Sequence, residues 1–363
     1  MLTPLARKAL AAVTPYTPGK PVEEVQRELG IASAMKLASN ENPLGPSPKA
    51  LQAIAQALSG LNRYPDSQCF YLTRRLAERM GVAPEQVVVG NGSDELITLA
   101  ARAFLDPGDE VVVAHPTFLI YRIAAQIAGC RIRTVPLRGF RYDLEGMRRA
   151  VTPRTKLIFI ANPDNPTGTY VTRPEVERFL DGLPRHAVVF FDEAYAELVE
   201  APDYPDTRGS LTRHPVILTR TFSKAYGLAG IRVGYGVAPR EIAEALQRVR
   251  EPFNVNSLAQ AAALAALEDA AHLEAFRRLL REERPFLTRA LEEMGFEPVP
   301  SVTNFILFKV GPKAAEAAEE LLKRGVIVRH MKGWDLPEHI RVTIGLHSEN
   351  TAFINALKEA RRV

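Results

Sequence analysis

Short, nearly continuous apolar runs recur through the first two thirds of this chain and alternate with amphipathic stretches. Such runs are typical of parallel strands that helices cover on both faces. They predict strands at Val87–Val89, Glu110–Ala114, Lys156–Ala161, Ala187–Phe191, Val216–Arg220 and Arg232–Val237. Helical periodicity between them predicts helices at Asp94–Phe104, Phe118–Ala128, Arg173–Leu180 and Arg240–Arg250. The alternation indicates an α/β fold whose mostly parallel sheet is sandwiched by helices.

The pattern differs at both ends of the chain. The opening stretch is broken by prolines and holds one short predicted helix, Val22–Leu29. After Pro252, helices are predicted at Ser257–Leu267, Ala270–Met294, Lys313–Arg324 and Glu349–Arg361, and strands at Thr303–Lys309, Val326–Arg329 and Ile340–Ile344. We therefore predict an arm over residues 1–34 that packs on the small domain or a partner subunit. A large domain over residues 35–250 and a small α+β domain over residues 251–363 follow it.

Composition excludes several classes of protein. The 363 residues are 46% hydrophobic and 24% charged, which is ordinary for a soluble globular protein. The formal net charge is +4 and the arginines are scattered, so we expect no nucleic-acid partner. This mild positive balance suits an anionic small molecule.

The cysteines and the longest apolar runs bear on location. Cys69 and Cys130 are too few for a disulfide framework and suggest a reducing, cytoplasmic compartment. Neither a signal peptide nor a membrane span is expected, because no apolar run is long enough. The seven histidines show no metal-binding spacing, so no metal is expected.

The segment Thr221–Gly230 sets Lys224 among small, hydroxylated and glycine residues directly after a predicted strand. The amine can condense with a carbonyl, and the small neighbours let a flat cofactor and its phosphate come close to the backbone. Taken alone, the lysine is as readily a solvated surface charge.

Three further polar residues follow predicted strands. Asp192 ends an apolar run and would pair with the nitrogen of a pyridine ring; alternatively it caps a helix or forms a salt bridge. Asn165, in the proline-fixed turn Asn162–Gly168, and Tyr195 would donate to a phenolic oxygen. The alternative for this run is an ordinary loop. Parallel sheets bind ligands at the carboxyl ends of their strands, where these residues would meet.

The turn Gly90–Asp94 lies between a predicted strand and a predicted helix, as a phosphate cradle would. Arg232 and Ser223 would add a charge and a hydroxyl to it. Phe118 would stack on a ring, unless it is simply a core residue. The turn matches neither a dinucleotide-binding pattern nor a nucleotide P-loop. Together with Lys224 and the polar positions, it predicts a pyridoxal phosphate (PLP) site.

These runs resemble the fold-type I PLP-dependent aminotransferases, which have an aspartate-aminotransferase-like fold, over nearly the whole chain. The likeness extends to Pro15–Glu24, Leu37–Pro46, Arg63–Asp66 and Arg341–Gly345. The first two of these runs are more diagnostic of one subfamily, the histidinol-phosphate aminotransferases (class II).

The resemblance implies roles for individual residues. Lys224 would be the Schiff-base lysine, Asp192 the partner of the ring nitrogen, and Asn165 and Tyr195 the phenolic-oxygen donors. The cofactor's phosphate would lie among Gly92, Ser93, Asp94, Thr221, Ser223 and Arg232, with Tyr64 reaching it from the neighbouring subunit of a homodimer. Tyr16 and Asn40 would lie near the substrate, with Arg341 binding a substrate carboxylate and Arg329 the substrate phosphate or distal acid.

The implied reaction is transamination of L-histidinol phosphate with 2-oxoglutarate, giving imidazole acetol phosphate and glutamate in histidine biosynthesis (EC 2.6.1.9). Alternatives on the same fold are an aromatic amino-acid aminotransferase and a decarboxylase of a phosphorylated amino acid. A non-catalytic PLP-binding regulator would need DNA-binding helices that the N-terminal arm is too short to provide. His347 and residues 330–334 depart from the family pattern beside the proposed substrate arginines, so the substrate is less defined than the cofactor.

Overall fold

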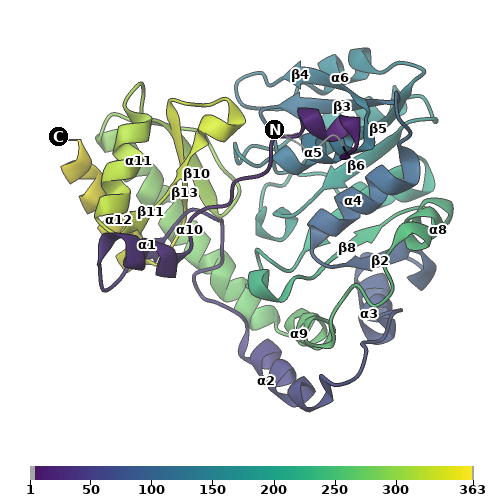
Figure 1. Ribbon diagram of the computed structural model, residues 1–363, viewed down its shortest axis with the longest axis horizontal. Coiled ribbons are helices and arrows are strands. Elements are labelled where there is room, and N and C mark those ends of the chain that lie inside the picture. The colour runs from purple at the N-terminus through teal and green to yellow at the C-terminus, as the bar shows by residue number, and fades with distance from the viewer. Residues whose placement is uncertain (1–4, 362–363) are drawn as a thin grey trace.

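The computed structural model describes residues 5–361. Its largest sheet has seven strands in the order β2-β8-β7-β6-β5-β3-β4 (Figure 1). The strands are β2 (Val87–Gly90), β3 (Glu110–His115), β4 (Arg131–Pro136), β5 (Thr155–Ala161), β6 (Val188–Asp192), β7 (Val216–Thr221) and β8 (Gly234–Val237). Only β8 runs antiparallel to its neighbours. The predicted α/β fold with a mostly parallel sheet is confirmed.

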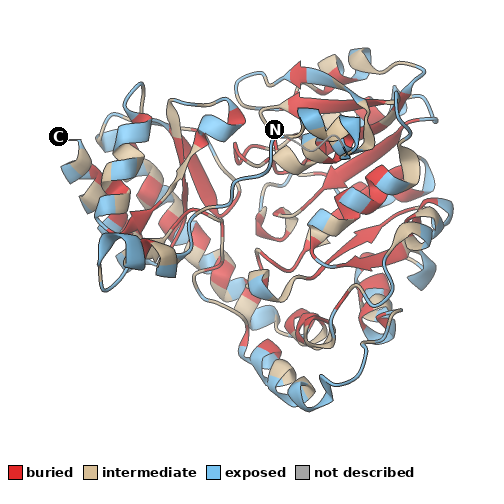
Figure 2. Ribbon diagram, viewed as in Figure 1, coloured by how far each residue is buried: buried red, intermediate tan, exposed pale blue. Residues whose placement is uncertain are grey.

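Helices cover this sheet, and its central strands are buried between them (Figure 2). Two groups pack side by side, α4 with α5 and α8, and α6 with α7. Their bounds are α4 (Ser93–Phe104), α5 (Leu119–Ala128), α6 (Leu144–Ala150), α7 (Arg173–Asp181) and α8 (Arg240–Val249). The sequence prediction lacks α6 and two further helices, α2 (Pro48–Ala57) and α3 (Phe70–Met80), which pack against α9 (Ser257–Leu267).

A second, antiparallel sheet has the order β12-β13-β10-β9. Its strands are β9 (Glu297–Pro298), β10 (Phe305–Lys309), β12 (Arg329–His330) and β13 (His339–Thr343). Three helices accompany it: α10 (Ala270–Glu293), α11 (Ala314–Lys323) and α12 (His347–Ala360). Short 3₁₀ turns lie at Lys8–Ala12, Leu58–Gly60, Pro84–Gln86, Ala196–Leu198, Thr207–Thr212, Ala229–Ile231 and Met331–Trp334.

The single strand predicted at Val326–Arg329 is wrong in one respect, because it is two strands in different sheets. β11 (Val326–Ile327) pairs with β1 (Met35–Lys36) in a separate two-stranded sheet, whereas β12 pairs with β13. The break at Val328 lets the chain pass from one sheet to the other. It thereby brings Arg329 opposite Arg341 of β13.

The N-terminal stretch contacts both parts of the molecule. Its first 3₁₀ turn packs against α5, and Val25 of α1 (Val22–Leu29) packs with Ala38 and Ile327. The extended chain between these contacts brings Tyr16 beside the carboxyl ends of the large sheet's strands. The division of the chain at residues 34 and 250 stays a prediction. Within residues 5–361, no helix is long and apolar enough to cross a bilayer.

Candidate active site

A cavity of about 300 Å³ opens at the carboxyl ends of β5, β6 and β7, facing the antiparallel sheet. It brings together residues that the sequence spreads over more than 300 positions. The predicted site residues in its wall are Tyr16, Asn40, Ser93, Asp94, Phe118, Asn165, Asp192, Tyr195, Thr221, Ser223, Lys224, Arg232, Arg329 and Arg341. Of the predicted set, Gly92 and Tyr64 lie outside the wall.

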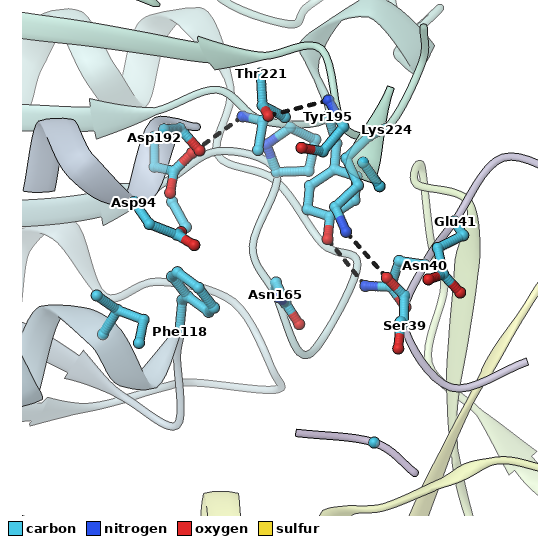
Figure 3. A pocket seen from close by; sticks show the side chains of 18 of the residues that line it. Ser39, Asn40, Glu41, Asp94, Phe118, Asn165, Asp192, Tyr195, Thr221 and Lys224 are labelled. Carbon is cyan, nitrogen blue, oxygen red and sulfur yellow. Dashed lines mark hydrogen bonds between the residues drawn. The ribbon is translucent and has the colours of Figure 1, made fainter. Parts of the chain in front are cut away.

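Asp192, the last residue of β6, presents a buried carboxylate to this cavity (Figure 3). Its Oδ2 accepts a hydrogen bond from the Tyr121 hydroxyl (2.7 Å), and its Oδ1 accepts one from the Ala194 amide (3.1 Å). Burial raises the pKa of this carboxyl group to about 6. A cationic ring nitrogen placed opposite would favour the ionised form and lower that pKa again.

Tyr121, which orients Asp192, was not predicted from the sequence. It lies on α5 and its ring stacks on Phe159 with centroids 4.8 Å apart. The only signal in the sequence is its spacing of three from Phe118, which places both on one helix face. A buried tyrosine at such a position reads equally well as core.

Lys224 lies in the loop after β7, the strand that pairs with β6, at whose end Asp192 lies. Its Nζ donates to the Ser39 carbonyl oxygen (3.0 Å) and lies 5.9 Å from the centroid of the Tyr195 ring. Burial, helped by the positive charge of Arg341, lowers the pKa of the Lys224 amine to about 8. A neutral amine is therefore accessible near physiological pH, as a nucleophile or base requires.

The hydroxyl of Tyr195 accepts a hydrogen bond from Asn40 Nδ2 (2.9 Å; Figure 3). Arg341 donates a hydrogen bond from Nη1 to Asn165 Oδ1 and another from Nη2 to the Ala38 carbonyl oxygen (3.0 Å). Among residues 5–361, the buried Asn40 Oδ1 and Arg341 Nε have no hydrogen-bond partner. Buried polar atoms left without partners commonly await a ligand or water.

An anion cradle lies at the start of α4. Arg232 reaches Ser223 Oγ (3.4 Å) and Asp94 Oδ2 (3.5 Å), close to the free backbone amides of the first helical turn. Gly92 has φ +80°, and a Cβ there would lie 2.4 Å from Arg232 Nη2. Gly92 thus stands behind the wall and leaves room for the arginine.

Arg329 and Arg341 are direct cross-strand neighbours, so their side chains leave the same face of the sheet. Arg341 is 4% exposed, whereas Arg329 is half-buried and donates to the Thr17 carbonyl oxygen. Two guanidinium groups of this kind suit a phosphate or a dicarboxylate.

Two residues singled out in the sequence lie away from the cavity. The Tyr64 side chain is 83% exposed, and its ring stacks on Phe253 at 4.7 Å. His347 begins α12, where its Nδ1 lies 2.9 Å from Glu283 Oε1. His347 is therefore not placed to contact a substrate in this cavity.

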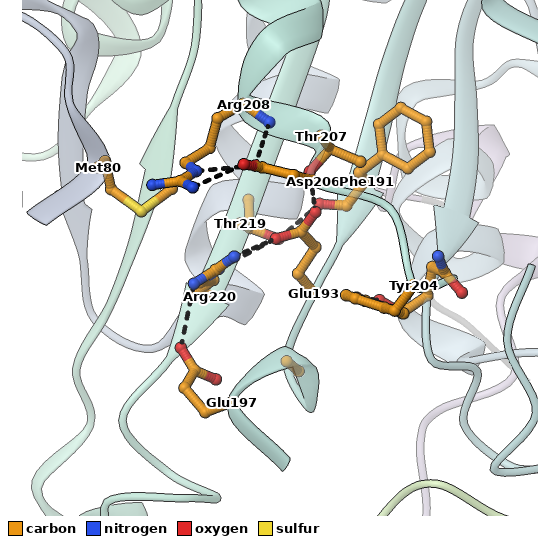
Figure 4. A network of polar contacts seen from close by, with 12 residues as sticks. Met80, Phe191, Glu193, Glu197, Tyr204, Asp206, Thr207, Arg208, Thr219 and Arg220 are labelled. Carbon is orange, nitrogen blue, oxygen red and sulfur yellow. Dashed lines mark hydrogen bonds and ion pairs between the residues drawn. The ribbon is translucent and has the colours of Figure 1, made fainter. Parts of the chain in front are cut away.

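A charged network supports the strand ends beneath the site (Figure 4). Arg220 of β7 lies 2.9 Å from Glu193 Oε2 and 3.7 Å from Glu197 Oε1. Thr207 also donates to Glu193. Because Glu193 directly follows Asp192, and Arg220 comes four residues before Lys224, the network ties the two site-bearing strands together.

The groups in the wall fit PLP. It offers an amine, a carboxylate, a tyrosine hydroxyl, an anion cradle and the Phe118 ring, the set that this cofactor needs from a protein. Within the described residues, no cluster of three or more His, Cys, Asp and Glu side chains is suited to a metal ion.

Comparison with known proteins agrees with this chemistry. The model of the family "Aminotransferase class I and II" matches residues 32–357. The chain is 49% identical to the histidinol-phosphate aminotransferase of Moorella thermoacetica over 358 residues, which cover 98% of this chain and 93% of that protein.

Solved structures extend the likeness to three dimensions. The histidinol-phosphate aminotransferase of Sinorhizobium meliloti, in complex with pyridoxal-5'-phosphate, aligns with a TM-score of 0.92 at 30% identity, over 99% of this chain and 98% of that one. The aspartate aminotransferase of Thermus thermophilus with maleate aligns with a TM-score of 0.85 at 25% identity, over 99% of each chain. The predicted aspartate-aminotransferase-like fold is thus confirmed. The chain belongs to the class I and II aminotransferases and, among them, to the histidinol-phosphate aminotransferase family.

Proposed function

We propose that this protein is a PLP-dependent aminotransferase that transfers the amino group of L-histidinol phosphate to 2-oxoglutarate. The products are imidazole acetol phosphate and glutamate, and the reaction is a step of histidine biosynthesis (EC 2.6.1.9). The observation that carries the proposal is that a half-buried amine, Lys224 in the loop after β7, and a buried acid, Asp192 at the end of the neighbouring strand β6, line one cavity. Relatives of that name, similar over nearly the full length, support the choice of substrate.

When bound, PLP would supply a carbonyl that condenses with amines and a pyridine ring that accepts electrons from the substrate carbon. Lys224 would hold the cofactor covalently in the resting enzyme. With an amine substrate bound, the Lys224 amine would act as the base that takes the proton from the substrate carbon and, once protonated, as the acid that returns it. A pKa of about 8 suits both roles, because the Lys224 amine can be either neutral or protonated near neutral pH.

Asp192 would keep the ring nitrogen protonated, which is what makes the ring an electron acceptor. Tyr121 and the Ala194 amide occupy one lone pair on each carboxylate oxygen and so fix the plane of the carboxylate. Asn165 and Tyr195 would donate to the phenolic oxygen. Phe118 would cover the ring face, which also excludes water from the reacting carbon.

The two ends of the bound molecules would be held as anions. Ser93, Asp94, Thr221, Ser223 and Arg232 surround the cradle at the start of α4, where the hydroxyls, the Arg232 guanidinium and the backbone amides of Ser93 and Asp94 would hold the cofactor's phosphate. Arg341 and Arg329 would bind the phosphate of histidinol phosphate in one half-reaction and the carboxylates of 2-oxoglutarate in the other, with Tyr16 and Asn40 beside them. One pair of guanidinium groups can serve both because each anion accepts paired hydrogen bonds.

We further propose a homodimer in which Tyr64 reaches the partner's cofactor phosphate. Tyr64 is exposed, and so are large apolar side chains close to it in the sequence: Leu51, Leu58, Leu61, Phe70 and Tyr71. Large apolar side chains left exposed in one stretch of a chain suit burial against a partner subunit. A cytoplasmic location is proposed from the two free cysteines and the biosynthetic role.

A half-reaction screen tests the function. Purified holoenzyme is mixed with histidinol phosphate, phenylalanine or a phosphorylated amino acid, and conversion of the cofactor to its amine form is followed by absorbance. We expect kcat/KM for histidinol phosphate to exceed that for phenylalanine at least about 100-fold, because the substrate's phosphate would pair with both arginines. A preference for phenylalanine, or release of carbon dioxide from the phosphorylated amino acid, would contradict the proposal.

A further inference from the structure

Trp334 is the only tryptophan of the chain and is almost fully buried, with 1% of its surface exposed. It ends the 3₁₀ turn Met331–Trp334 that directly follows β12. It belongs to a small apolar cluster with Val299, Leu307 and Met331, against which Leu119, Phe140 and Leu336 pack. This turn lies in the 330–334 segment, beside the proposed substrate arginines.

The indole ring contacts both proposed substrate arginines. Its centroid lies 5.0 Å from Arg329 Cζ and 5.9 Å from Arg341 Cζ. These two arginines stand directly opposite each other on β12 and β13, a placement in which like charges repel. An electron-rich aromatic face within 6 Å attracts each cation and so offsets part of that repulsion.

Other aromatic rings contact only one arginine each. Tyr16 lies 5.7 Å from Arg329, and Phe305 lies 5.2 Å from Arg341. Tyr16 also meets the indole edge-on, with centroids 6.1 Å apart. Trp334 is thus the ring that the two guanidinium groups share among the described residues.

Trp334 acts from behind the site rather than in it. It does not line the candidate cavity but borders an adjoining one of about 430 Å³, which shares Tyr16, Phe118 and Arg329 with it. The indole Nε1 has no hydrogen-bond partner among residues 5–361. Its influence on the arginines therefore comes from the ring face and from packing.

We propose that Trp334 is a positioning residue that sets the spacing and direction of Arg329 and Arg341 and so determines affinity for substrates with an anionic tail. The inference rests on the proposed function for the identity of those substrates. It adds that the contact of both guanidinium groups with the Trp334 ring is what keeps them placed to bind one anion together.

Steady-state kinetics of Trp334→Leu, Trp334→Phe and a control test the inference. Loss of the ring in Trp334→Leu should raise KM for histidinol phosphate and for 2-oxoglutarate about ten-fold each, since two cation–π contacts are lost. The value of kcat should stay within about two-fold, because Trp334 touches no reacting group. Trp334→Phe keeps an aromatic face and should recover most of the loss.

The control is Phe353→Leu, which removes a fully buried ring from α12 that contacts neither arginine. It should leave both KM values within about two-fold of wild type. Unchanged KM values in Trp334→Leu, or an equal rise in the control, would overturn the proposal.

Tryptophan fluorescence supplies a readout independent of turnover, and of whether Trp334→Leu folds. Wild-type holoenzyme is titrated with inorganic phosphate, which leaves the cofactor's chemical form unchanged, at constant ionic strength. We expect a saturable change in emission that is absent in Arg341→Met, because Trp334 is the sole tryptophan. No change in wild type, or the same change in Arg341→Met, would overturn the inference. A saturable change in an enzyme that rejects histidinol phosphate would refute the proposed function alone.

Discussion

At the scale of single residues, the candidate site depends on how far the amine of the half-buried Lys224 is shielded from water. Removing the amine from water disfavours its charged form, and the neighbouring guanidinium of Arg341 acts in the same direction. The Ser39 carbonyl oxygen is the acceptor that remains for it. Without the cofactor, shielding this lysine from water therefore lowers the free energy of unfolding, by an amount that depends on pH.

We expect this pH dependence to appear in the free energy of unfolding of the cofactor-free protein. The pKa of Lys224 is about 8 when folded, against about 10.4 in an unfolded chain. Between these values the unfolded chain binds more protons, so stability rises with pH. The free energy of unfolding of wild type relative to Lys224→Met should rise by about 2 kcal/mol from pH 7.5 to pH 9.5. Urea denaturation at both pH values measures this difference; a constant difference would mean that the lysine is not desolvated.

The sequence supports prediction of residues whose chemistry and local setting agree. Lys224 and Asp192 each follow an apolar run, and a parallel sheet brings the ends of such runs together. Tyr121 and Ser39 carry no such signal, since one occupies a helix face like any core residue and the other contributes only a backbone carbonyl oxygen. Their roles arise from tertiary contacts.

At the scale of secondary-structure elements, β6 and β7 carry the site, and the Arg220 network joins them. Glu193 and Glu197 have 1% and 5% of their side chains exposed, so water screens their charges little. Arg220 is the cation that compensates both. Buried carboxylates deprived of their partner are strongly unfavourable.

Arg220→Met should therefore lower the free energy of unfolding by about 3–5 kcal/mol, because it leaves two buried carboxylates without a cation. The triple variant that also carries Glu193→Gln and Glu197→Gln should recover much of this loss. Arg248→Met is the matched control, since it breaks an exposed pair with Glu244 and should cost less than about 1 kcal/mol. Urea denaturation of wild type, Arg220→Met, the triple variant and Arg248→Met measures these differences. Equal losses of unfolding free energy in Arg220→Met and Arg248→Met would contradict the network's role.

Elements with continuous apolar runs were predicted closely, the edge strand β2 among them, whereas strands without such a run were not. β4 was not predicted, because it lies at the sheet edge and exposes Arg131, Arg133 and Thr134 instead of forming an apolar run. The strand predicted at Arg232–Val237 begins at Gly234, since Arg232 adopts φ +63° and turns toward the cradle. Functional geometry overrides local preference there.

At the scale of the whole molecule, the cavity needs segments from along the entire chain. Tyr16 comes from the N-terminal stretch, Lys224 from the large sheet and Arg341 from the antiparallel sheet. A partner subunit would add Tyr64. No local pattern predicts that meeting; the resemblance to a family did.

Subunit complementation tests the shared site. Lys224→Ala and Tyr64→Ala homodimers should each be nearly inactive. A hybrid dimer has one site with both substitutions and one with neither. Mixing the two proteins under exchange conditions should therefore restore about a quarter of wild-type activity at equal amounts, since random exchange makes half the dimers hybrid. Activity that stays at the level of the parents after confirmed exchange would show that Tyr64 acts within its own subunit or not at all.

The central claim is that Lys224 holds the cofactor while Asp192 faces its ring nitrogen. Borohydride reduction of the holoenzyme, followed by peptide mass spectrometry, tests it most directly by fixing the cofactor to the amine that carries it. We predict that the pyridoxyl group lies on the peptide containing Lys224, and that Asp192→Asn retains this label while kcat falls about 10²- to 10³-fold. A label on another lysine, or no label on a protein that turns over substrate, would contradict the account.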